Sequence, residues 1–151
     1  MSSAAAGPRH TDARLSRLID WYEGLTPQSL GQLGEFYAPH AQFKDPFNDV
    51  SGVAAISAIF EHMFKTLRQP RFEVREVVLQ GDDAFLVWDF LFQFRGADAA
   101  VQCVRGTTHL KWGADGRITW HRDYWDAAEE LYEKLPVVGA LMRWLKRRAR
   151  G

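Results

Sequence analysis

The chain has 151 residues, 46% of them hydrophobic and 25% charged, which is the size and balance of one soluble globular domain. Its single cysteine, Cys103, excludes an internal disulfide, and a domain of this length needs none to fold. Nineteen basic and nineteen acidic residues give zero formal net charge, so the overall charge does not support a nucleic-acid partner.

The first half of the chain is predicted to be mainly helical. Residues 1–10 lack the basic start and long apolar segment of a signal peptide, so we expect a disordered tail and a cytoplasmic protein. Apolar residues then recur at helical spacing over 11–23, 26–37 and 53–67, and Thr11 or Asp12 is a suitable N-cap for the first helix. Residues 41–43 suit a short strand, and the pairs Asn48-Asp49 and Ser51-Gly52 suit turns.

The pattern changes period after Pro70. Alternating apolar and polar residues predict four antiparallel strands over 71–80, 85–95, 101–112 and 118–125, with a phase slip at Glu76-Val77. A run of helices followed by a run of strands indicates an α+β domain, which we place at 11–126. A twisted antiparallel sheet with helices on one side curls around them, so its concave face holds either core or a pocket.

The C-terminal segment, 127–151, is predicted to form a basic amphipathic helix. Val137, Val138, Leu141, Trp144 and Leu145 share one face, while residues 143–151 hold five bases and no acid. Two interpretations stay open. The segment Val137–Arg150 lies on an anionic membrane or a partner protein, or it packs on the sheet with its basic face in solvent.

Strand parity selects the residues on the concave side of the sheet. His121, Asp123 and Trp125 share one side of the last strand, whereas Trp120, Arg122 and Tyr124 share the other. A four-residue loop at 113–116 predicts that Thr108 faces His121 across the hairpin. Because a buried histidine and aspartate need partners, they pair with each other as a structural unit, or they meet Asp45 or a ligand; otherwise this face is turned to solvent.

Two further acids have a structural and a functional interpretation. Asp45, just before Pro46, suits either a turn or a site at the pocket mouth. Asp89 interrupts an apolar strand, so it is either a pocket acid or the ion-pair partner of a neighbouring arginine such as Arg105. The sequence holds no His or Cys cluster at metal-ligand spacing and no glycine-rich phosphate loop, so we predict no metal and no cofactor.

Two segments resemble a known superfamily. Residues 36–46 (Phe-Tyr-Ala-Pro-His-Ala-Gln-Phe-Lys-Asp-Pro) and 116–126 (Gly-Arg-Ile-Thr-Trp-His-Arg-Asp-Tyr-Trp-Asp) are similar to the nuclear transport factor 2-like superfamily, which includes SnoaL-like polyketide cyclases, ketosteroid isomerase and limonene epoxide hydrolase. The likeness spans residues 12–126. It implies three helices packed in the concave face of a strongly curved, mixed but mainly antiparallel sheet, a cone-like barrel with a C-terminal helix added. It also implies a homodimer through the outer side of the sheet.

The resemblance places several residues at functional positions. Asp45 matches the general base of ketosteroid isomerase, whose oxyanion-hole tyrosine and aspartate positions hold Trp21 and Thr108 here. Asp123 matches an essential acid of the epoxide hydrolases and lies near the base position of the cyclases. Where the hydrolases have Tyr-x-Asn and Arg-x-Asp, this chain has Phe43-Lys-Asp45 and Asp89-Phe-Leu91. The catalytic residue sets of the isomerase and of the hydrolases are therefore both incomplete in this chain.

The expected site is an apolar pocket that holds a small lipid-like or polycyclic molecule. Its catalytic candidates are Asp45, Asp123 and His121, and its binding candidates are Trp21, Phe43, Trp88, Asp89, Thr108 and Trp125. Two functions fit such a pocket: a cofactor-free proton-transfer enzyme of isomerase, cyclase or hydrolase type, and a non-catalytic small-molecule binding or accessory protein.

Overall fold

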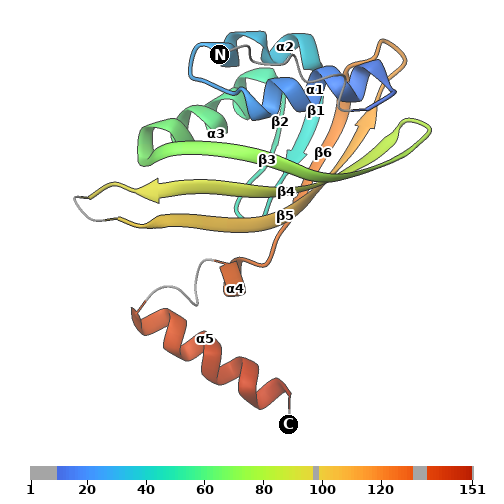
Figure 1. Ribbon diagram of the computed structural model, residues 1–151. Helices are drawn as coiled ribbons and strands as arrows, with labels where there is room; N and C mark the ends of the chain where they lie inside the picture. The colour runs from blue at the N-terminus through green and yellow to red at the C-terminus, as the bar shows by residue number, and fades with distance from the viewer. Residues whose placement is uncertain (1–9, 97–98, 131–135, 151) are drawn as a thin grey trace, which may run out of the picture.

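Six strands form one curved sheet in the order β2-β1-β6-β5-β4-β3 (Figure 1). The structure is a computed structural model that describes residues 10–96, 99–130 and 136–150. The strands are β1 (Tyr37–Lys44), β2 (Asp49–Ser51), β3 (Leu67–Gln80), β4 (Asp83–Phe94), β5 (Val101–Trp112) and β6 (Ile118–Tyr124). The helices are α1 (Ala13–Glu23), the 3-10 turn η1 (Ser29–Gln32), α2 (Leu33–Phe36), α3 (Val53–Thr66), α4 (Ala127–Glu130) and α5 (Pro136–Ala149).

The sheet is mixed but mainly antiparallel, as the family resemblance implied. β1 runs parallel to β6, and the four other neighbouring pairs are antiparallel. The turns predicted at Asn48-Asp49 and Ser51-Gly52 are only partly correct. Asp49–Ser51 forms β2 and pairs with residues 42–44 of β1, whereas Asn48 closes a turn and Gly52 is a bend with a φ of 94°. The turn lies one step earlier, where the backbone N–H of Asp45 donates to the carbonyl of Asn48.

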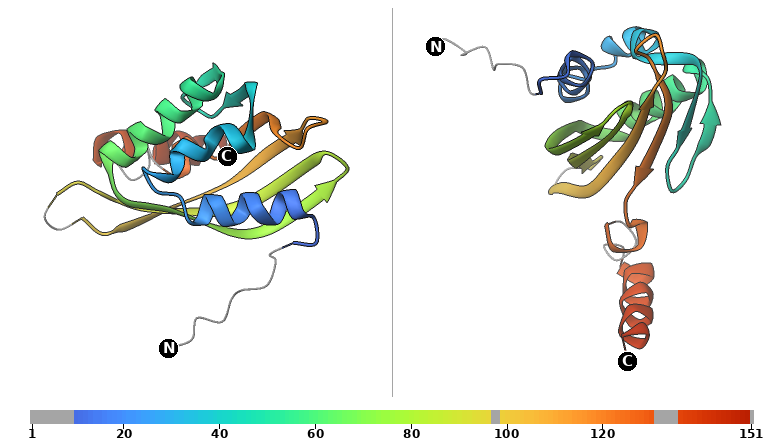
Figure 2. Two further views of the ribbon diagram at one scale, coloured as in Figure 1. Left: turned by 90° about the horizontal axis from the view of Figure 1, so that it is seen from above. Right: turned by 90° about the vertical axis from the view of Figure 1, so that its right-hand side faces the viewer.

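Helices α1 and α3 lie on the concave side of the sheet, where the strands curl around them (Figure 2). Each helix contributes the apolar stripe that its spacing predicted, since Leu15, Leu18 and Ile19 of α1 and Ile56 of α3 are almost fully buried. The second predicted helix is much shorter than 26–37. Only η1 and α2 are helical there, because Tyr37 already begins the extended strand that contains Pro39.

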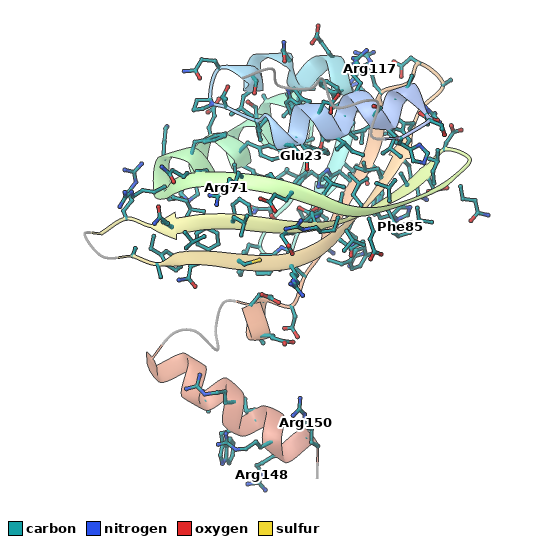
Figure 3. All side chains as sticks on the ribbon, in the orientation of Figure 1. Glu23, Arg71, Phe85, Arg117, Arg148 and Arg150 are labelled. Carbon is teal, nitrogen blue, oxygen red and sulfur yellow. The ribbon has the colours of Figure 1, made fainter. Side chains whose placement is uncertain are left out.

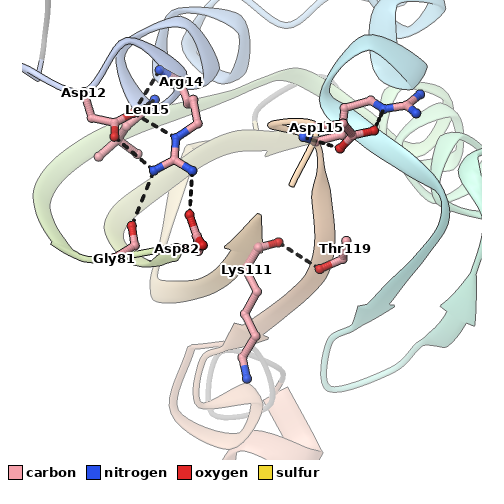
Figure 4. A network of polar contacts seen from close by, with 9 residues as sticks. Asp12, Arg14, Leu15, Gly81, Asp82, Lys111, Asp115 and Thr119 are labelled. Atoms are coloured by element: carbon pink, nitrogen blue, oxygen red, sulfur yellow. Dashed lines mark hydrogen bonds and ion pairs between the residues drawn. The ribbon is translucent and has the colours of Figure 1, made fainter. Parts of the chain in front are cut away.

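The start of α1 is fixed to the β3–β4 turn (Figure 4). Asp12 is the N-cap, and its carboxylate accepts hydrogen bonds from the backbone N–H groups of Arg14 and Leu15. The Arg14 guanidinium donates to Asp12 and reaches the carboxylate of Asp82 at 2.8 Å. The hydrogen bond from the Arg14 side chain, reinforced by the backbone N–H of Leu15, holds the pKa of Asp12 below its usual value.

A β-bulge in β3 confirms the phase slip predicted at Glu76-Val77. The pairing with β4 shifts between Val74 and Glu76, so that Val74 and Val77 both point toward the helices. The carboxylate of Glu23, at the end of α1, accepts a hydrogen bond from the Val74 N–H at 2.9 Å. This contact attaches α1 to the bulge.

Helix α5 extends away from the domain beyond α4 and does not lie on the sheet (Figures 1 and 2). The part of the chain that the structure describes contains no helix long and apolar enough to cross a membrane. The predicted N-terminal tail, apart from residue 10, lies outside the described residues, and so does the segment 131–135 between α4 and α5.

Candidate functional site

A cavity of about 450 Å³ lies between α3 and the concave face of the sheet. Its walls are almost entirely apolar, and the acids among its lining residues are Asp45 and Asp123. The aromatic wall comes from alternate residues of β4 and from residues of β1, β3 and α3: Phe43, Phe60, Phe72, Trp88, Phe90, Phe92 and Phe94. A volume of this size accommodates a small organic ligand.

A smaller chamber of about 30 Å³ continues inward from the cavity, with room for about one or two water molecules. The two spaces share Phe60, Phe72, Trp88 and Asp123 in their walls. The inner chamber is also lined by Tyr22, Thr108 and His121. Asp123 therefore lies at the boundary between an apolar cavity and a polar chamber.

The Asp123 carboxylate is held in place through one of its two oxygens. Oδ1 accepts a hydrogen bond from the Thr108 hydroxyl at 2.5 Å, and His121 Nε2 lies 2.8 Å from the same oxygen. The Thr108 hydroxyl in turn accepts from the indole N–H of Trp88 at 2.7 Å. No described residue donates to Oδ2 of Asp123, and the side chain keeps 18% of its surface exposed. One oxygen is therefore fixed and the other is available to a ligand.

Two buried tyrosines extend this network behind His121. The Tyr37 hydroxyl lies 2.7 Å from His121 Nδ1 and is hydrogen-bonded to the Tyr22 hydroxyl. Since an ionised Asp123 only accepts, His121 Nε2 carries the proton and Nδ1 accepts from Tyr37. The single Tyr37 proton is then used, so Tyr22 donates to Tyr37. Every donor in this arrangement has an acceptor, with His121 neutral.

Burial controls the chemistry of the two tyrosines. It raises the pKa of both hydroxyls well above the ordinary tyrosine value, because an anion there would lose its hydration. The negative charge of Asp123 adds to the increase for each of them. Both hydroxyls stay protonated as donors over the whole neutral range, which keeps His121 in the tautomer that supports Asp123.

The prediction that His121 and Asp123 share the concave face is correct, although the predicted register is wrong. Thr108 faces Asp123, and His121 faces Leu110, because the pairing is shifted by two residues and contains a bulge between Lys111 and Trp112. A shift of two residues keeps each side chain on its predicted face. Thr108 consequently meets the carboxylate and not the imidazole.

The structure places most predicted binding residues at the two spaces. Phe43, Trp88 and Trp125 line the cavity, and Thr108 lines the inner chamber. Phe43 also stacks on the His121 ring with a centroid distance of 4.4 Å. Trp21 lines neither space. It is buried against Phe36, and its indole N–H donates to the Ser29 carbonyl, so its neighbour Tyr22 takes the wall position.

Asp45 lies at the cavity mouth, but its carboxylate is engaged in its own turn. Oδ1 accepts from the backbone N–H groups of Phe47 at 2.7 Å and Asn48 at 2.6 Å, and both oxygens contact the Asn48 amide. The turn interpretation of this residue is therefore correct. An acceptor surrounded by donors is a poor proton donor to a ligand.

Asp89 points to the outer side of the sheet, away from the cavity. Its carboxylate forms ion pairs with Arg75 Nε at 2.9 Å and Arg105 Nε at 3.2 Å, across β3 and β5. The pocket role predicted for Asp89 is wrong, and the ion-pair alternative, including Arg105 by name, is correct. The reason is strand parity, since Trp88 and Phe90 on either side of it line the cavity.

Sequence reasoning missed Tyr22 and Tyr37 as site residues, because both were assigned to apolar helix stripes. The signal was available in the hydroxyl groups, since a buried tyrosine needs a hydrogen-bond partner and so does a buried histidine. Within the described residues, no three His, Cys, Asp or Glu side chains come together to hold a metal ion.

Residues 18–121 match the family model of the SnoaL-like domain. The chain belongs to the SnoaL-like domain family. The match ends at His121, two residues before Asp123. No curated protein matches the chain.

Solved structures of similar fold place this SnoaL-like domain in the nuclear transport factor 2-like fold. A hypothetical protein of ketosteroid isomerase-like fold from Catenulispora acidiphila, in complex with trimethylamine, is 18% identical with a TM-score of 0.67, covering 81% of this chain and 92% of its own. A putative SnoaL-like polyketide cyclase from Shewanella putrefaciens is 16% identical with a TM-score of 0.67, and the match covers 81% of this chain and 98% of the cyclase. AclR, a putative hydroxylase from Streptomyces galilaeus, is 16% identical with a TM-score of 0.65, and the match covers 82% of this chain and 96% of AclR.

Proposed function

We propose that this SnoaL-like protein is a cofactor-free enzyme that moves a proton on a small, mostly apolar molecule held in the cavity. The observation that carries the proposal is the Asp123 carboxylate. One of its oxygens is fixed by Thr108 and His121, and the other is available to an apolar space of about 450 Å³. A carboxylate held in this way is suited to act as a general base.

The network behind Asp123 defines the role of each supporting residue. His121 donates to Oδ1 and keeps the carboxylate oriented, while Tyr37 and Tyr22 fix the tautomer of the imidazole. Since every donor of this network points toward Asp123, the proton that Oδ2 takes up stays on the carboxyl group until it returns to another atom of the bound molecule. Asp45 completes the cavity mouth, but the four hydrogen bonds that its carboxylate accepts within its own turn support a structural role.

The aromatic walls support a lipid-like or polycyclic substrate. Apolar and aromatic side chains surround the cavity, so a ligand there exchanges hydration for aromatic contact. Structures of similar fold include putative SnoaL-like polyketide cyclases. The reaction type, isomerase, cyclase or hydrolase, follows from which bond of the bound molecule lies against Asp123.

A non-catalytic binding protein is the second candidate, and a specific observation favours it. A base that removes a proton leaves negative charge on the substrate, which a hydrogen-bond donor must stabilise. The hydroxyls of Tyr22 and Thr108, which line the inner chamber, donate to Tyr37 and Asp123 in the resting network. The enzyme therefore needs one of these hydroxyls to turn toward its substrate.

The variant Asp123→Asn separates the two candidates. The amide oxygen still accepts from Thr108 and His121, so shape and stability are kept while the base is lost. Wild type and variant are compared for binding of anilinonaphthalene sulfonate, an apolar dye, and for turnover of a panel of polycyclic and isoprenoid ketones. Retained dye binding with turnover lost in the variant supports the enzyme. Binding without turnover in either protein supports the binder.

A matched control is Asp49→Asn, since Asp49 is exposed on β2 and lines neither space. The variant Asp45→Asn tests the mouth residue, because an asparagine preserves the turn that Asp45 makes. Loss of turnover in Asp45→Asn to the same extent as in Asp123→Asn contradicts the assignment of the base to Asp123 alone.

A further inference from the structure

Helix α5 exposes apolar and basic side chains together. Leu141 is 54% exposed, and Trp144 and Leu145 are each 45% exposed. The fifteen residues 136–150 include five bases and no acid. Arg148 and Arg150 stand on this helix well clear of the sheet (Figure 3). The described part of the chain thus leaves Leu141, Trp144 and Leu145 largely uncovered.

Four of the five bases lie opposite the apolar face of the helix. Leu141, Trp144 and Leu145 lie at spacings of three and four residues, and so do Arg143, Arg147 and Arg150 on the other side. Arg148 follows Trp144 by four residues and Leu145 by three, so it lies on the apolar face, with its guanidinium 5.1 Å from the centre of the Trp144 ring. An arginine beside a tryptophan lays its aliphatic part along the apolar surface while its guanidinium reaches the headgroups.

We propose that α5 docks the protein on an anionic lipid surface. The apolar face enters the boundary of the acyl chains, and the basic face contacts the lipid headgroups. A nucleic acid would neutralise the bases but would leave the leucines and the tryptophan in water. Two copies of α5 packed by their apolar faces would bring two sets of five bases close together. A bilayer with negative headgroups satisfies both faces at once.

The charge of the rest of the chain supports docking through α5 alone. Residues 1–142 hold nineteen acids and fourteen bases, a net charge of −5. An anionic surface repels such a body, so the domain is held off the bilayer while the helix lies on it. The segment between Asp126, which lines a hollow beside the cavity mouth, and Pro136 spans at most about 36 Å.

Docking has a consequence for ligand entry that rests on the proposed function. Trp125 and Asp123 line both the cavity and the outer hollow that Asp126 borders. The chain therefore tethers the mouth within about 36 Å of the docked helix, so lipid-like molecules that leave the bilayer reach it over a short distance. The docking itself does not depend on the cavity having an enzymatic role.

Flotation of the full-length protein with vesicles tests the proposal. We expect binding to vesicles of phosphatidylcholine and phosphatidylserine and none to phosphatidylcholine alone. Removing two bases in Arg147→Gln with Arg150→Gln should weaken binding about 25-fold, at about fivefold for each charge. Leu145→Gln on the apolar face should weaken it about tenfold. The matched control, Arg71→Gln with Lys111→Gln, removes two exposed bases from the sheet and should bind as wild type does.

Three results would overturn the proposal. They are absence of flotation with the anionic vesicles, equal binding to neutral vesicles, and α5 variants that bind as well as the control. Sedimentation velocity without lipid tests whether α5 joins two copies of the chain instead. A dimer that Leu145→Gln dissociates would assign α5 to contact between two copies of the chain. Because the substituted side chains are exposed, circular dichroism should show unchanged folding in every variant.

Discussion

The two buried tyrosines make stability depend on alkaline pH. Burial raises the pKa of Tyr22 and Tyr37 in the folded protein, whereas both titrate near pH 10 in the unfolded chain. The folded state thus keeps two protons that the unfolded state releases. This contribution to stability is complete below about pH 10 and is lost as pH rises toward the folded-state pKa values.

The magnitude follows from the number of groups. Each retained proton lowers the free energy of unfolding by up to about 1.4 kcal/mol per pH unit, so two give about 2.7 kcal/mol per unit. At about pH 11, roughly one unit above the unfolded pKa, the total loss is about 3 kcal/mol. That is a large fraction of the roughly 5–15 kcal/mol stability of a typical domain.

Urea unfolding measured between about pH 8 and pH 11 tests this expectation, with tyrosinate absorbance followed in parallel. In the double variant Tyr22→Phe with Tyr37→Phe the alkaline loss should disappear. Tyr124→Phe, which removes a tyrosine that is 48% exposed, should leave it unchanged. Unfolding free energies that stay constant to about pH 11 in wild type, or that fall equally in the double variant, would refute the buried network.

Three other predictions concern the frame of the site. Asp12→Ala removes the N-cap of α1 and should cost about 1 kcal/mol in urea unfolding at neutral pH. Since folding lowers the pKa of Asp12, the extra stability of the wild type over Asp12→Ala should persist above about pH 4 and disappear as the pH falls through that lowered pKa. A stability difference that remains in acid would contradict this explanation. Gly106→Ala puts a Cβ into the Trp88 ring, so thermal unfolding should show a loss of about 1–3 kcal/mol, together with weaker dye binding. An unchanged variant would mean that Trp88 is not held as described. The homodimer predicted from the resemblance stays a prediction, and sedimentation equilibrium that finds only monomer at micromolar concentration would reject it.

The periodicity of the sequence predicted much of the fold because local spacing determines which face of an element is buried. Helix α3 and strand β5 lie almost where their patterns placed them, and the bulge near Glu76 appeared as a slip in the alternation. Parity along β6 likewise placed His121 and Asp123 together. The parallel contact of β1 with β6 left no local trace, and it entered only through the family resemblance.

The details of the site depended on contacts that the sequence does not encode locally. Trp112 pairs with Ile118, one residue later than predicted, and the bulge at Lys111 adds a second residue to the shift, which brought Thr108 to Asp123. Tyr22 and Tyr37 come from a helix and a strand that meet only in the folded core, so their connection to His121 needed the tertiary structure. Asp89 was assigned to the pocket because an acid that interrupts an apolar strand gives the same sequence pattern on the inner and on the outer side of the sheet.

The central claim is that an apolar molecule binds in the cavity against the free oxygen of Asp123. The most direct measurement is a crystal structure of the protein soaked with a polycyclic ketone that it binds. We predict density between α3 and the sheet, with the ligand atom nearest Asp123 within about 3 Å of Oδ2. A ligand bound elsewhere, or a cavity closed by its own aromatic side chains, would contradict the account.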